Sequence, residues 1–266
     1  MDKRAPAVAG RFYPADGGAL AGEVRKYLAA GGPATPRTAC VAPHAGYSFS
    51  GPTAGRTLAR VTVPATVIIL SPNHTGAGAG IAVWTAGAWR TPLGDVAIDA
   101  AAAVSVAKLT GAQADTAAHR NEHSIEVMLP FLKTIRPDVR IVPVTIMTHD
   151  LAALVRFGRE LAGFVRGAAE RPLVLASSDM THMESAESAH AKDMQCVARM
   201  EAVDPEGLFN LVNEQRISMC GVAPVTAMLA MARELGLKRG ELVEYTSSGD
   251  TSGDYHRVVG YAGLVF

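Results

Sequence analysis

The sequence lacks the features that mark several classes of protein. Its 25 Lys and Arg balance 25 Asp and Glu, so it has no basic surplus for binding nucleic acid or an anionic membrane surface. Its three cysteines, Cys40, Cys196 and Cys220, are too few and too scattered for a disulfide framework. No run approaches the roughly 18 to 20 apolar residues that cross a bilayer, and no apolar segment follows the charged N-terminus. We therefore expect a cytoplasmic protein with reduced thiols and with neither nucleic acid nor membrane as a partner.

Common nucleotide-binding and hydrolase motifs are also missing. There is no GxxxxGK[ST] loop, no GxSxG elbow and no HExxH helix, and the GAGAG stretch at 76–80 opens no clear helix. Enough apolar sequence is present for a packed core, because 48% of the residues are hydrophobic, and this excludes disorder over most of the length. At 266 residues the chain is near the upper size of one core, and we expect one domain over 1–266.

Six short apolar runs, rich in β-branched and aliphatic residues, predict strands. They are continuous rather than alternating, which is typical of strands covered on both faces. Helix-like stretches separate them, so the pattern predicts an α/β fold: a single domain with a mostly parallel central sheet flanked by helices. Residues 76–95 interrupt the alternation and indicate a β-hairpin, and Pro130 indicates a kink or a restart in its helix. The six runs are 38–42, 65–70, 140–147, 172–177, 242–246 and 257–266.

Three of these runs lead directly into a histidine-containing turn. His44 follows the first run, His74 follows the second, and His182 follows the fourth, with Asp179 in the same SSDMTH segment. Because ligands of open α/β sheets bind beyond the carboxyl ends of the strands, we expect the three imidazoles to meet at one rim. Neutral imidazole binds Zn, Cu, Fe or Ni, and near pH 7 it also transfers protons. The sequence therefore predicts a metal site, an acid–base site or both.

Two residues compete as the third metal ligand. Asp179 would complete a set of two histidines and one carboxylate, which suits non-haem iron. Cys220 would supply a thiolate, which suits Fe, Cu(I) or Zn, and its place at the start of a helix would lower the pKa of its thiol. Spacing alone leaves both open. His123, just before a helix, is either a cap or a site residue. The histidines with no strand-end context are expected at the surface: His119, His149, His190 and His256.

Motifs spread along the whole chain resemble those of one family. They are AVAGRFYP at 7–14, APHAGYSFSG at 42–51, SPNHTG at 71–76, TPLGD at 91–95, EHSIEVMLPFL at 122–132, SSDMTH at 177–182, CGVAPV at 220–225, and TSGD followed by VVGYAGLVF. In this order they resemble the Memo-like family, whose bacterial and archaeal members are called AmmeMemoRadiSam system protein B. The resemblance implies a single α/β domain similar to the LigB-type class III extradiol dioxygenases, which are non-haem iron enzymes.

The resemblance also selects among the ligands left open above. In the family the metal is held by the histidines of the PHAGY and PNHTG motifs and by the cysteine of the CG motif. These correspond here to His44, His74 and Cys220. The resemblance further implies that Asp179 and His182 line the same pocket as catalytic residues, with the histidine of EHSIE as another member. It implies one redox-active metal ion, for which we favour iron, with copper as the alternative.

Two positions depart from the prokaryotic pattern: Met183 stands where an aromatic residue follows SSDMTH, and Ala223 stands where the CG segment has a second glycine. Neither change removes a ligand. The first hypothesis is a metal-dependent, dioxygenase-like oxidoreductase acting on a small molecule, in which His182, oriented by Asp179, moves a proton and His123 positions the substrate. The second is a non-catalytic metal-chelating or peptide-binding protein that uses the same cleft. The family name implies radical-SAM and AMMECR-type proteins as its partners.

Overall fold

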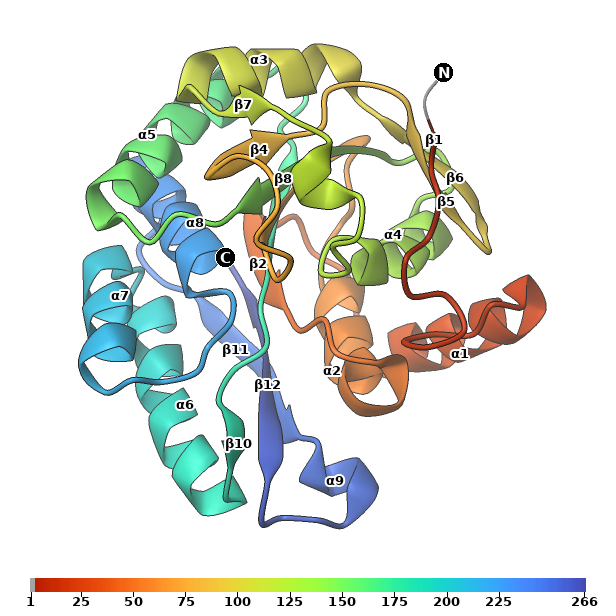
Figure 1. The fold of residues 1–266 in the computed structure, drawn as a ribbon, viewed down its shortest axis with the longest axis vertical. Coiled ribbons are helices and arrows are strands. Elements are labelled where there is room, and N and C mark those ends of the chain that lie inside the picture. The colour runs from red at the N-terminus through yellow and green to blue at the C-terminus, as the bar shows by residue number, and fades with distance from the viewer. Residues whose placement is uncertain (1–2) are drawn as a thin grey trace.

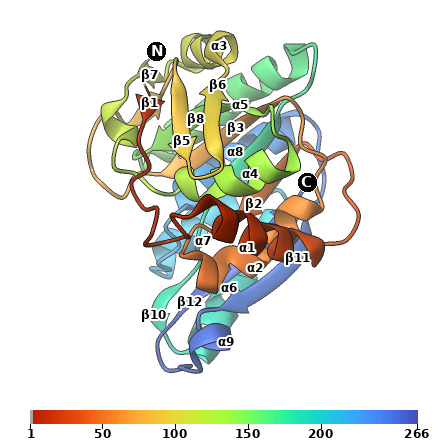
Figure 2. The ribbon, with the colours of Figure 1, turned by 90° about the vertical axis from the view of Figure 1, so that its right-hand side faces the viewer.

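A computed structural model describes residues 3–266, which form one mixed sheet with helices on both faces (Figures 1 and 2). The strand order is β1-β5-β6-β8-β3-β9-β2-β12-β10, with β11 beside β12, and with β4 beside β7 and β8. The strands are β1 (Lys3–Arg4), β2 (Ala39–Ala42), β3 (Thr66–Pro72), β4 (Ile81–Val83), β5 (Ala88–Thr91), β6 (Gly94–Ile98), β7 (Gln113–Ala114), β8 (Arg140–Ile146), β9 (Leu173–Ser177), β10 (His182–Glu184), β11 (Glu241–Ser247) and β12 (Val258–Val265).

The centre of the sheet is parallel, as the sequence predicts. Strands β6, β8, β3, β9 and β2 are parallel neighbours, so their carboxyl ends lie at the same rim. Every residue of β2 and of β9 is buried, which explains why both read as continuous apolar runs. The hairpin predicted for 76–95 is formed by β5 and β6, at 88–98. Beside β2, β12 is antiparallel, and β11 pairs antiparallel with β12. All six predicted runs are strands.

The helices cover both faces of this sheet. α1, α2 and α4 pack against one another, and α3, α5 and α8 form a second group on the opposite side (Figure 2). α6 and α7 pack against each other, with α6 on β12 and α7 on α8. The helices are α1 (Gly17–Ala29), α2 (Tyr47–Ala59), α3 (Ala100–Thr110), α4 (Leu129–Ile135), α5 (Leu151–Gly167), α6 (Ala186–Glu201), α7 (Pro205–Glu214), α8 (Val222–Glu234) and α9 (Gly249–Ser252).

Local chemistry sets several of these helix boundaries. The Asp16 and Asp150 side chains each accept a hydrogen bond from the first turn of α1 and α5, which stabilises those helix starts. Pro130 lies in the first turn of α4, directly after a 3₁₀ turn at Glu126–Met128, so the helix restarts there. In the middle of α5, Gly158 lets the helix approach α8, because a Cβ there would stand 2.3 Å from the carbonyl oxygen of Ala227.

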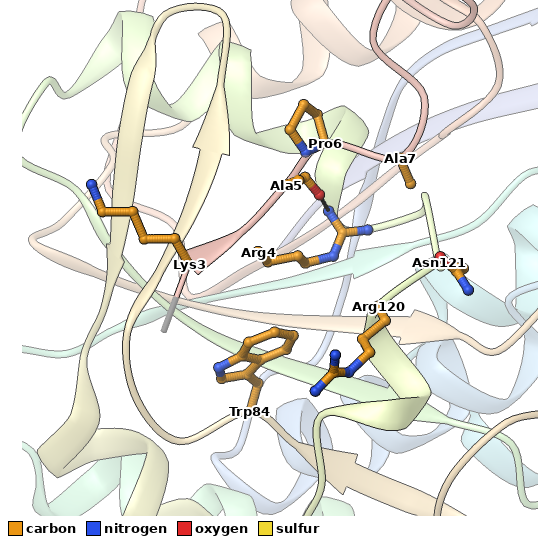
Figure 3. Close-up of a pocket in the computed structure, with 8 residues that line it drawn as sticks. All are labelled: Lys3, Arg4, Ala5, Pro6, Ala7, Trp84, Arg120 and Asn121. Carbon is orange, nitrogen blue, oxygen red and sulfur yellow. Dashed lines mark hydrogen bonds between the residues drawn. The ribbon is translucent and has the colours of Figure 1, made fainter. Parts of the chain in front are cut away.

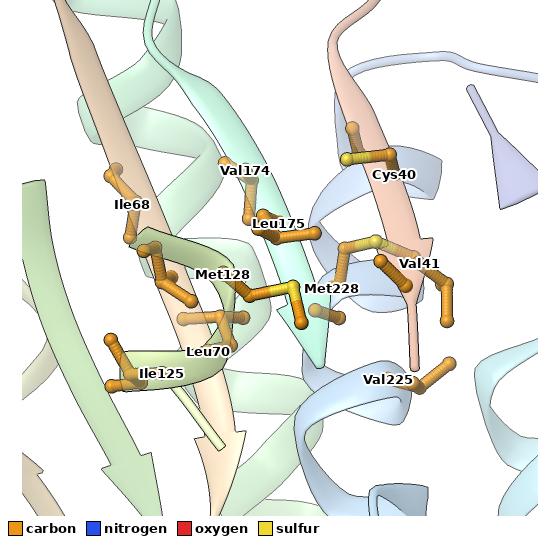
Figure 4. Close-up of a cluster of buried hydrophobic side chains, with 14 of the residues drawn as sticks. Cys40, Val41, Ile68, Leu70, Ile125, Met128, Val174, Leu175, Val225 and Met228 are labelled. Carbon is orange, nitrogen blue, oxygen red and sulfur yellow. The ribbon is translucent and has the colours of Figure 1, made fainter. Parts of the chain in front are cut away.

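The core lies between the sheet and its helices (Figure 4). Side chains of the central strands, such as Ile68 of β3 and Leu175 of β9, are fully buried there. Val225 and Met228 bring α8 into the same cluster, and Met128 of the 3₁₀ turn joins it. This packing fixes the central strands on both faces, so the turns that leave their carboxyl ends start from rigid positions. Within residues 3–266 no helix combines the length and apolar content that crossing a bilayer requires.

One expectation about burial is wrong. His119 is fully buried, not at the surface. Strand β1 brings the Arg4 side chain against the main chain of His119. The centroid of the His119 ring lies 6.1 Å from that of Trp84 and 5.9 Å from that of Trp89. The covering residues come from distant parts of the chain, so the local sequence around His119 does not reveal them.

Candidate metal centre

Three histidines converge at the carboxyl-end rim of the sheet. His44 follows β2 by two residues, His74 follows β3 by two, and His123 comes from the loop before the 3₁₀ turn. One ligand atom from each histidine lies within 4.8 Å of the ligand atoms of the other two. Within residues 3–266, the group of three or more His, Cys, Asp or Glu side chains that lie close enough to share a metal ion consists of these three histidines. We call these three residues the histidine cluster. His44 is buried, while the side chains of His74 and His123 are 34% and 21% exposed, so the cluster opens to solvent on one side.

The ring of His44 is oriented by a serine at the end of β9. Its Nδ1 lies 2.7 Å from Ser177 Oγ, and this hydroxyl donates its own proton to the carbonyl oxygen of Ser124 at 2.9 Å. The hydroxyl therefore accepts from His44 Nδ1–H. This leaves the lone pair of His44 on Nε2, the nitrogen that lies beside Cys220 Sγ.

A carboxylate that the sequence analysis did not single out holds the other two histidines. Glu122 Oε1 lies 2.9 Å from His74 Nδ1, and Glu122 also accepts from the main-chain amide of His74. The same side chain accepts from the main-chain amides of His123 and Ser124, at 2.8 and 3.0 Å, and from the Ser124 hydroxyl at 2.9 Å. The bond to His74 Nδ1–H leaves the lone pair of His74 on Nε2. A carboxylate behind a histidine is the usual means of fixing a metal-binding imidazole.

These contacts set the charge states of the centre. Burial acts to raise the pKa of Glu122, but the hydrogen bonds and charge of His74 outweigh it and hold that pKa well below its usual range. Burial lowers the pKa of His44, and the neighbouring His123 and His74 lower it further. Burial also lowers the pKa of His123. For His74, burial is opposed and outweighed by Glu122, which raises the pKa. At neutral pH, His44 and His123 are therefore neutral, the form that coordinates metals.

Cys220 and Asp179, the two competing third ligands, lie beside His44. Cys220 Sγ is 3.3 Å from His44 Nε2 and accepts from the main-chain amide of Asp179 at 3.3 Å. The Asp179 carboxylate accepts from the main-chain amide of His44 at 2.7 Å. Neither belongs to the group of mutually close ligand atoms, in which the third place is taken by His123. The thiol is adjacent to the histidine cluster, and its service as a ligand stays a prediction.

The electrostatics of Cys220 differ from the expectation. Its position just before α8 predicts a lowered pKa, but burial raises the pKa of the thiol well above its usual value, and the Asp179 charge adds to this. The helix dipole is outweighed because the sulfur is desolvated. Burial also raises the pKa of Asp179, to about 6. In the metal-free protein Cys220 is therefore a protonated thiol.

The structure places His182 at the same end of the sheet but holds it differently from the sequence prediction. Its Nδ1 faces two carbonyl oxygens, that of Met180 at 2.7 Å and that of Ser218 at 2.9 Å. Asp179 was expected to orient this ring, but the side chain of Asp179 is turned toward the end of β2 instead. Nδ1 is therefore the protonated nitrogen, and Nε2 is the basic atom. Met183, directly after it, has a left-handed backbone, φ 62°, at an irregularity in the pairing of β10 with β12.

The residues that sequence reasoning missed are those that orient the cluster. Glu122 lies within the EHSIE segment, next to a histidine, and that adjacency was the available signal. Ser177, the last residue of β9, begins the SSDMTH segment, but its partners Ser124 and His44 are 53 and 133 residues away, so the local sequence does not show which ring it orients.

The fold and the site together define a class: single-domain α/β proteins with histidines gathered beyond the carboxyl ends of a mostly parallel sheet. More specifically, the chain belongs to the Memo-like protein family, whose profile matches residues 4–265. It is 44% identical over 280 residues to a MEMO1 family protein of Methanopyrus kandleri, with 99% of each chain covered. It is 39% identical over 270 residues to a MEMO1 family protein of Aquifex aeolicus, with both chains fully covered.

A solved structure supports the fold. The chain is similar to an uncharacterized protein from Escherichia coli K12, with a TM-score of 0.51, 13% sequence identity, and coverage of 84% of this chain and 98% of the other. At that identity the likeness concerns the fold alone. The family and the fold class predicted from the sequence are thus both confirmed.

Proposed function

We propose that the protein binds one redox-active metal ion through the histidine cluster. The observation that carries this proposal is the convergence of His44, His74 and His123, with the Nδ1 atoms of the first two already bonded to Ser177 and Glu122. Two ligand atoms on one ion at about 2.1 Å lie at most about 4.2 Å apart, so small side-chain rotations bring these atoms onto a shared ion. Three imidazole nitrogen donors suit Fe, Cu, Zn or Ni. The resemblance of the motifs favours iron, with copper as the alternative.

The function that follows is dioxygenase-like oxidoreductase chemistry on a small molecule. A bound ion would supply one-electron chemistry, and three protein ligands would leave positions open for a substrate. The protein's own residues have separable tasks. Glu122 and Ser177 fix the ligating rings, and Asp179 fixes the turn that carries His44. His182, with Nε2 as its basic atom, holds or moves a proton at the edge of the site.

One observation supports a second, non-catalytic function. Cys220 Sγ lies 3.3 Å from His44 Nε2. If this thiol releases its proton to solvent and the thiolate binds the ion, three imidazoles and one thiolate form a closed four-ligand sphere, which is typical of structural and storage sites. The protein would then chelate metal or present the cleft to a peptide, with radical-SAM and AMMECR-type proteins as proposed partners. In either case we place the protein in the cytoplasm, where its three free thiols stay reduced.

The test is metal analysis of protein purified anaerobically, with single alanine variants of the histidine cluster. We expect about one iron or copper per wild-type chain and almost none in His44→Ala or His74→Ala. Glu122→Gln should bind with about 10- to 100-fold lower affinity, since it keeps the side chain's shape and one acceptor oxygen but loses the negative charge and the second acceptor oxygen behind His74. His149→Ala, an exposed histidine outside the site, is the matched control. Metal content equal to wild type in both cluster variants would defeat the proposal.

The state of Cys220 separates the two functions. A Cys220→Ser variant that binds the ion as tightly as wild type argues for an open, three-histidine sphere and hence for catalysis. A large loss of affinity argues for the closed sphere. Exchange of a small ligand such as azide at the wild-type ion, followed by absorption spectroscopy, gives an independent answer, because only an open sphere admits it.

A further inference from the structure

The N-terminal segment, residues 3–13, is bound to the loop that supplies Glu122 and His123. Arg4 is only 3% exposed, and its guanidinium lies over the ring of Trp89, 4.1 Å from the centroid. Its Nε donates to the carbonyl oxygen of His119 at 2.8 Å, and Nη2 donates to the carbonyl oxygen of Glu122. Its Nη1 donates to the Glu126 carboxylate at 2.6 Å. One side chain therefore contacts this loop at three points, residues 119, 122 and 126.

Glu126 completes the connection from the opposite side. Its side chain is fully buried and accepts from the main-chain amides of Ala7 and Val8, at 2.8 and 3.0 Å, and from Tyr13 Oη at 2.6 Å, besides Arg4. All of these donors belong to the N-terminal segment. The ion pair of Arg4 and Glu126 thus clamps residues 119–126 between two fixed ends, with Glu122 and His123 in the middle.

The ion pair of Arg4 and Glu126 contributes more to the positions of its neighbours than to the stability of the fold. Removing two charges from water costs about as much as their attraction returns, so a buried ion pair adds little net stability compared with apolar residues of the same size. A planar guanidinium, however, donates in several fixed directions at once, which a lysine ammonium does not reproduce. Here those directions reach two carbonyl oxygens of the loop as well as the carboxylate.

We propose that Arg4 is a positioning residue for the metal centre: by holding the main chain of Glu122, it sets the place of the carboxylate that orients His74 and of the adjacent His123. This inference rests on the proposed metal binding. Arg4 would thus act in the site although it lies 118 positions before Glu122, whose carbonyl oxygen it binds.

The position of Arg4 permits a chemical rescue. Arg4 lines a cavity of about 310 Å³ together with Trp84, Arg120 and Asn121, and Figure 3 shows its guanidinium between the N-terminal segment and that loop. Truncation to alanine would enlarge this cavity by the volume of the side chain. Free methylguanidinium can then enter it and donate to the same carbonyl oxygens, whereas ammonium supplies charge without the planar donors.

The experiment measures Co²⁺ binding, because the visible spectrum of bound Co²⁺ reports coordination geometry as well as affinity. We expect Arg4→Lys to weaken binding about tenfold and to change the spectrum, in line with the usual effect of residues behind a metal ligand. Arg4→Ala should behave likewise and regain affinity and spectrum with methylguanidinium, used far below denaturing concentrations, but not with ammonium. Leu161→Ala, which removes buried side-chain volume in α5, is the control for loss of stability alone and should keep both.

The outcomes separate this inference from the function it rests on. Wild-type affinity and spectrum in both Arg4 variants, with normal Co²⁺ binding by the wild type, overturn the positioning role and leave metal binding intact. No Co²⁺ binding by the wild type overturns both. If the Arg4 variants do not fold, Glu126→Gln replaces them, since it breaks the ion pair but keeps an acceptor. An unchanged Co²⁺ spectrum in that variant, folded by circular dichroism, contradicts the proposal.

Discussion

Beneath the N-terminal strand, His119 has its Nδ1 only 2.9 Å from Thr145 Oγ1 and no exposure to solvent. Burial is the main cause that lowers its pKa, and the charge of Arg4 adds to it, so the pKa falls to about 4. In the unfolded chain a histidine has a pKa of about 6.5. Between these values the unfolded state binds the proton and the folded state does not. Stability is therefore fully present above the unfolded pKa and is lost as the pH falls toward 4.

This difference in pKa predicts that His119 alone makes part of the free energy of unfolding depend on pH. Between pH 7 and pH 5 the wild type should lose about 2 kcal/mol more of its free energy of unfolding than His119→Gln, as calculated by linkage from the two pKa values. Urea unfolding of both proteins at the two pH values measures this. His149→Gln, at an exposed position, should follow the wild type. If His119→Gln and the wild type lose stability in parallel, His119 is not the group that takes up the proton.

At the scale of residues, the sequence reveals candidate ligands better than it reveals the side chains that orient them. His44 and His74 could be found because each follows an apolar run, and the end of a buried strand is a position that sequence pattern fixes. His123 was named, but as a positioning residue, because nothing local shows that its loop crosses to the rim of the sheet. Glu122 and Arg4 act through partners far away in the chain, and such pairings follow only from the finished fold.

The elements follow from the sequence more closely than the site does. The long strands could be predicted because burial on both faces leaves a continuous apolar run. The long helices could be predicted because a helical period that begins at an aspartate N-cap is a local pattern. The two-residue strands β1 and β7 leave none, since their pairing depends on β5 and β4 and not on their own residues. β10 is also short, and Met183 within it has the backbone conformation that glycine favours.

The contact between α5 and α8 gives a prediction with a control in the same helix. Gly158→Ala should destabilise the protein by about 1 to 3 kcal/mol, because its Cβ would stand 2.3 Å from a carbonyl oxygen of α8 and 2.7 Å from the Ala230 side chain. Gly163→Ala, with nothing within 4 Å of the new Cβ, should gain up to about 1 kcal/mol from helix propensity. Thermal and urea unfolding of both variants check this. Equal effects of the two substitutions would contradict the close packing.

At the scale of the whole molecule, the histidine cluster joins parts of the chain that are far apart. His44, His74 and His123 are supplied by three segments, and the sheet brings them together only in the folded state. An ion that binds the folded state and not the unfolded one stabilises the former by mass action.

Metal should therefore raise the melting temperature. At a free ion concentration of 100 times the Kd the gain is about 2.7 kcal/mol, which corresponds to roughly 5 to 10 °C for a chain of this size. Differential scanning calorimetry with Fe²⁺ under anaerobic conditions measures the shift, and addition of a chelator should reverse it. His74→Ala is the variant in which no shift is expected. A shift of the same size in that variant would mean that the ion binds elsewhere.

The place of β12 has a consequence for how the protein is made. β2, which delivers His44, has β9 on one side and the C-terminal β12 on the other. Until residues 258–265 have been translated and have formed β12, β2 has an unpaired edge, and the strand that leads into His44 lacks one of its two neighbours. Binding of the proposed metal ion should thus follow the pairing of β12 with β2, and a nascent chain stalled before residue 258 should bind no iron or copper.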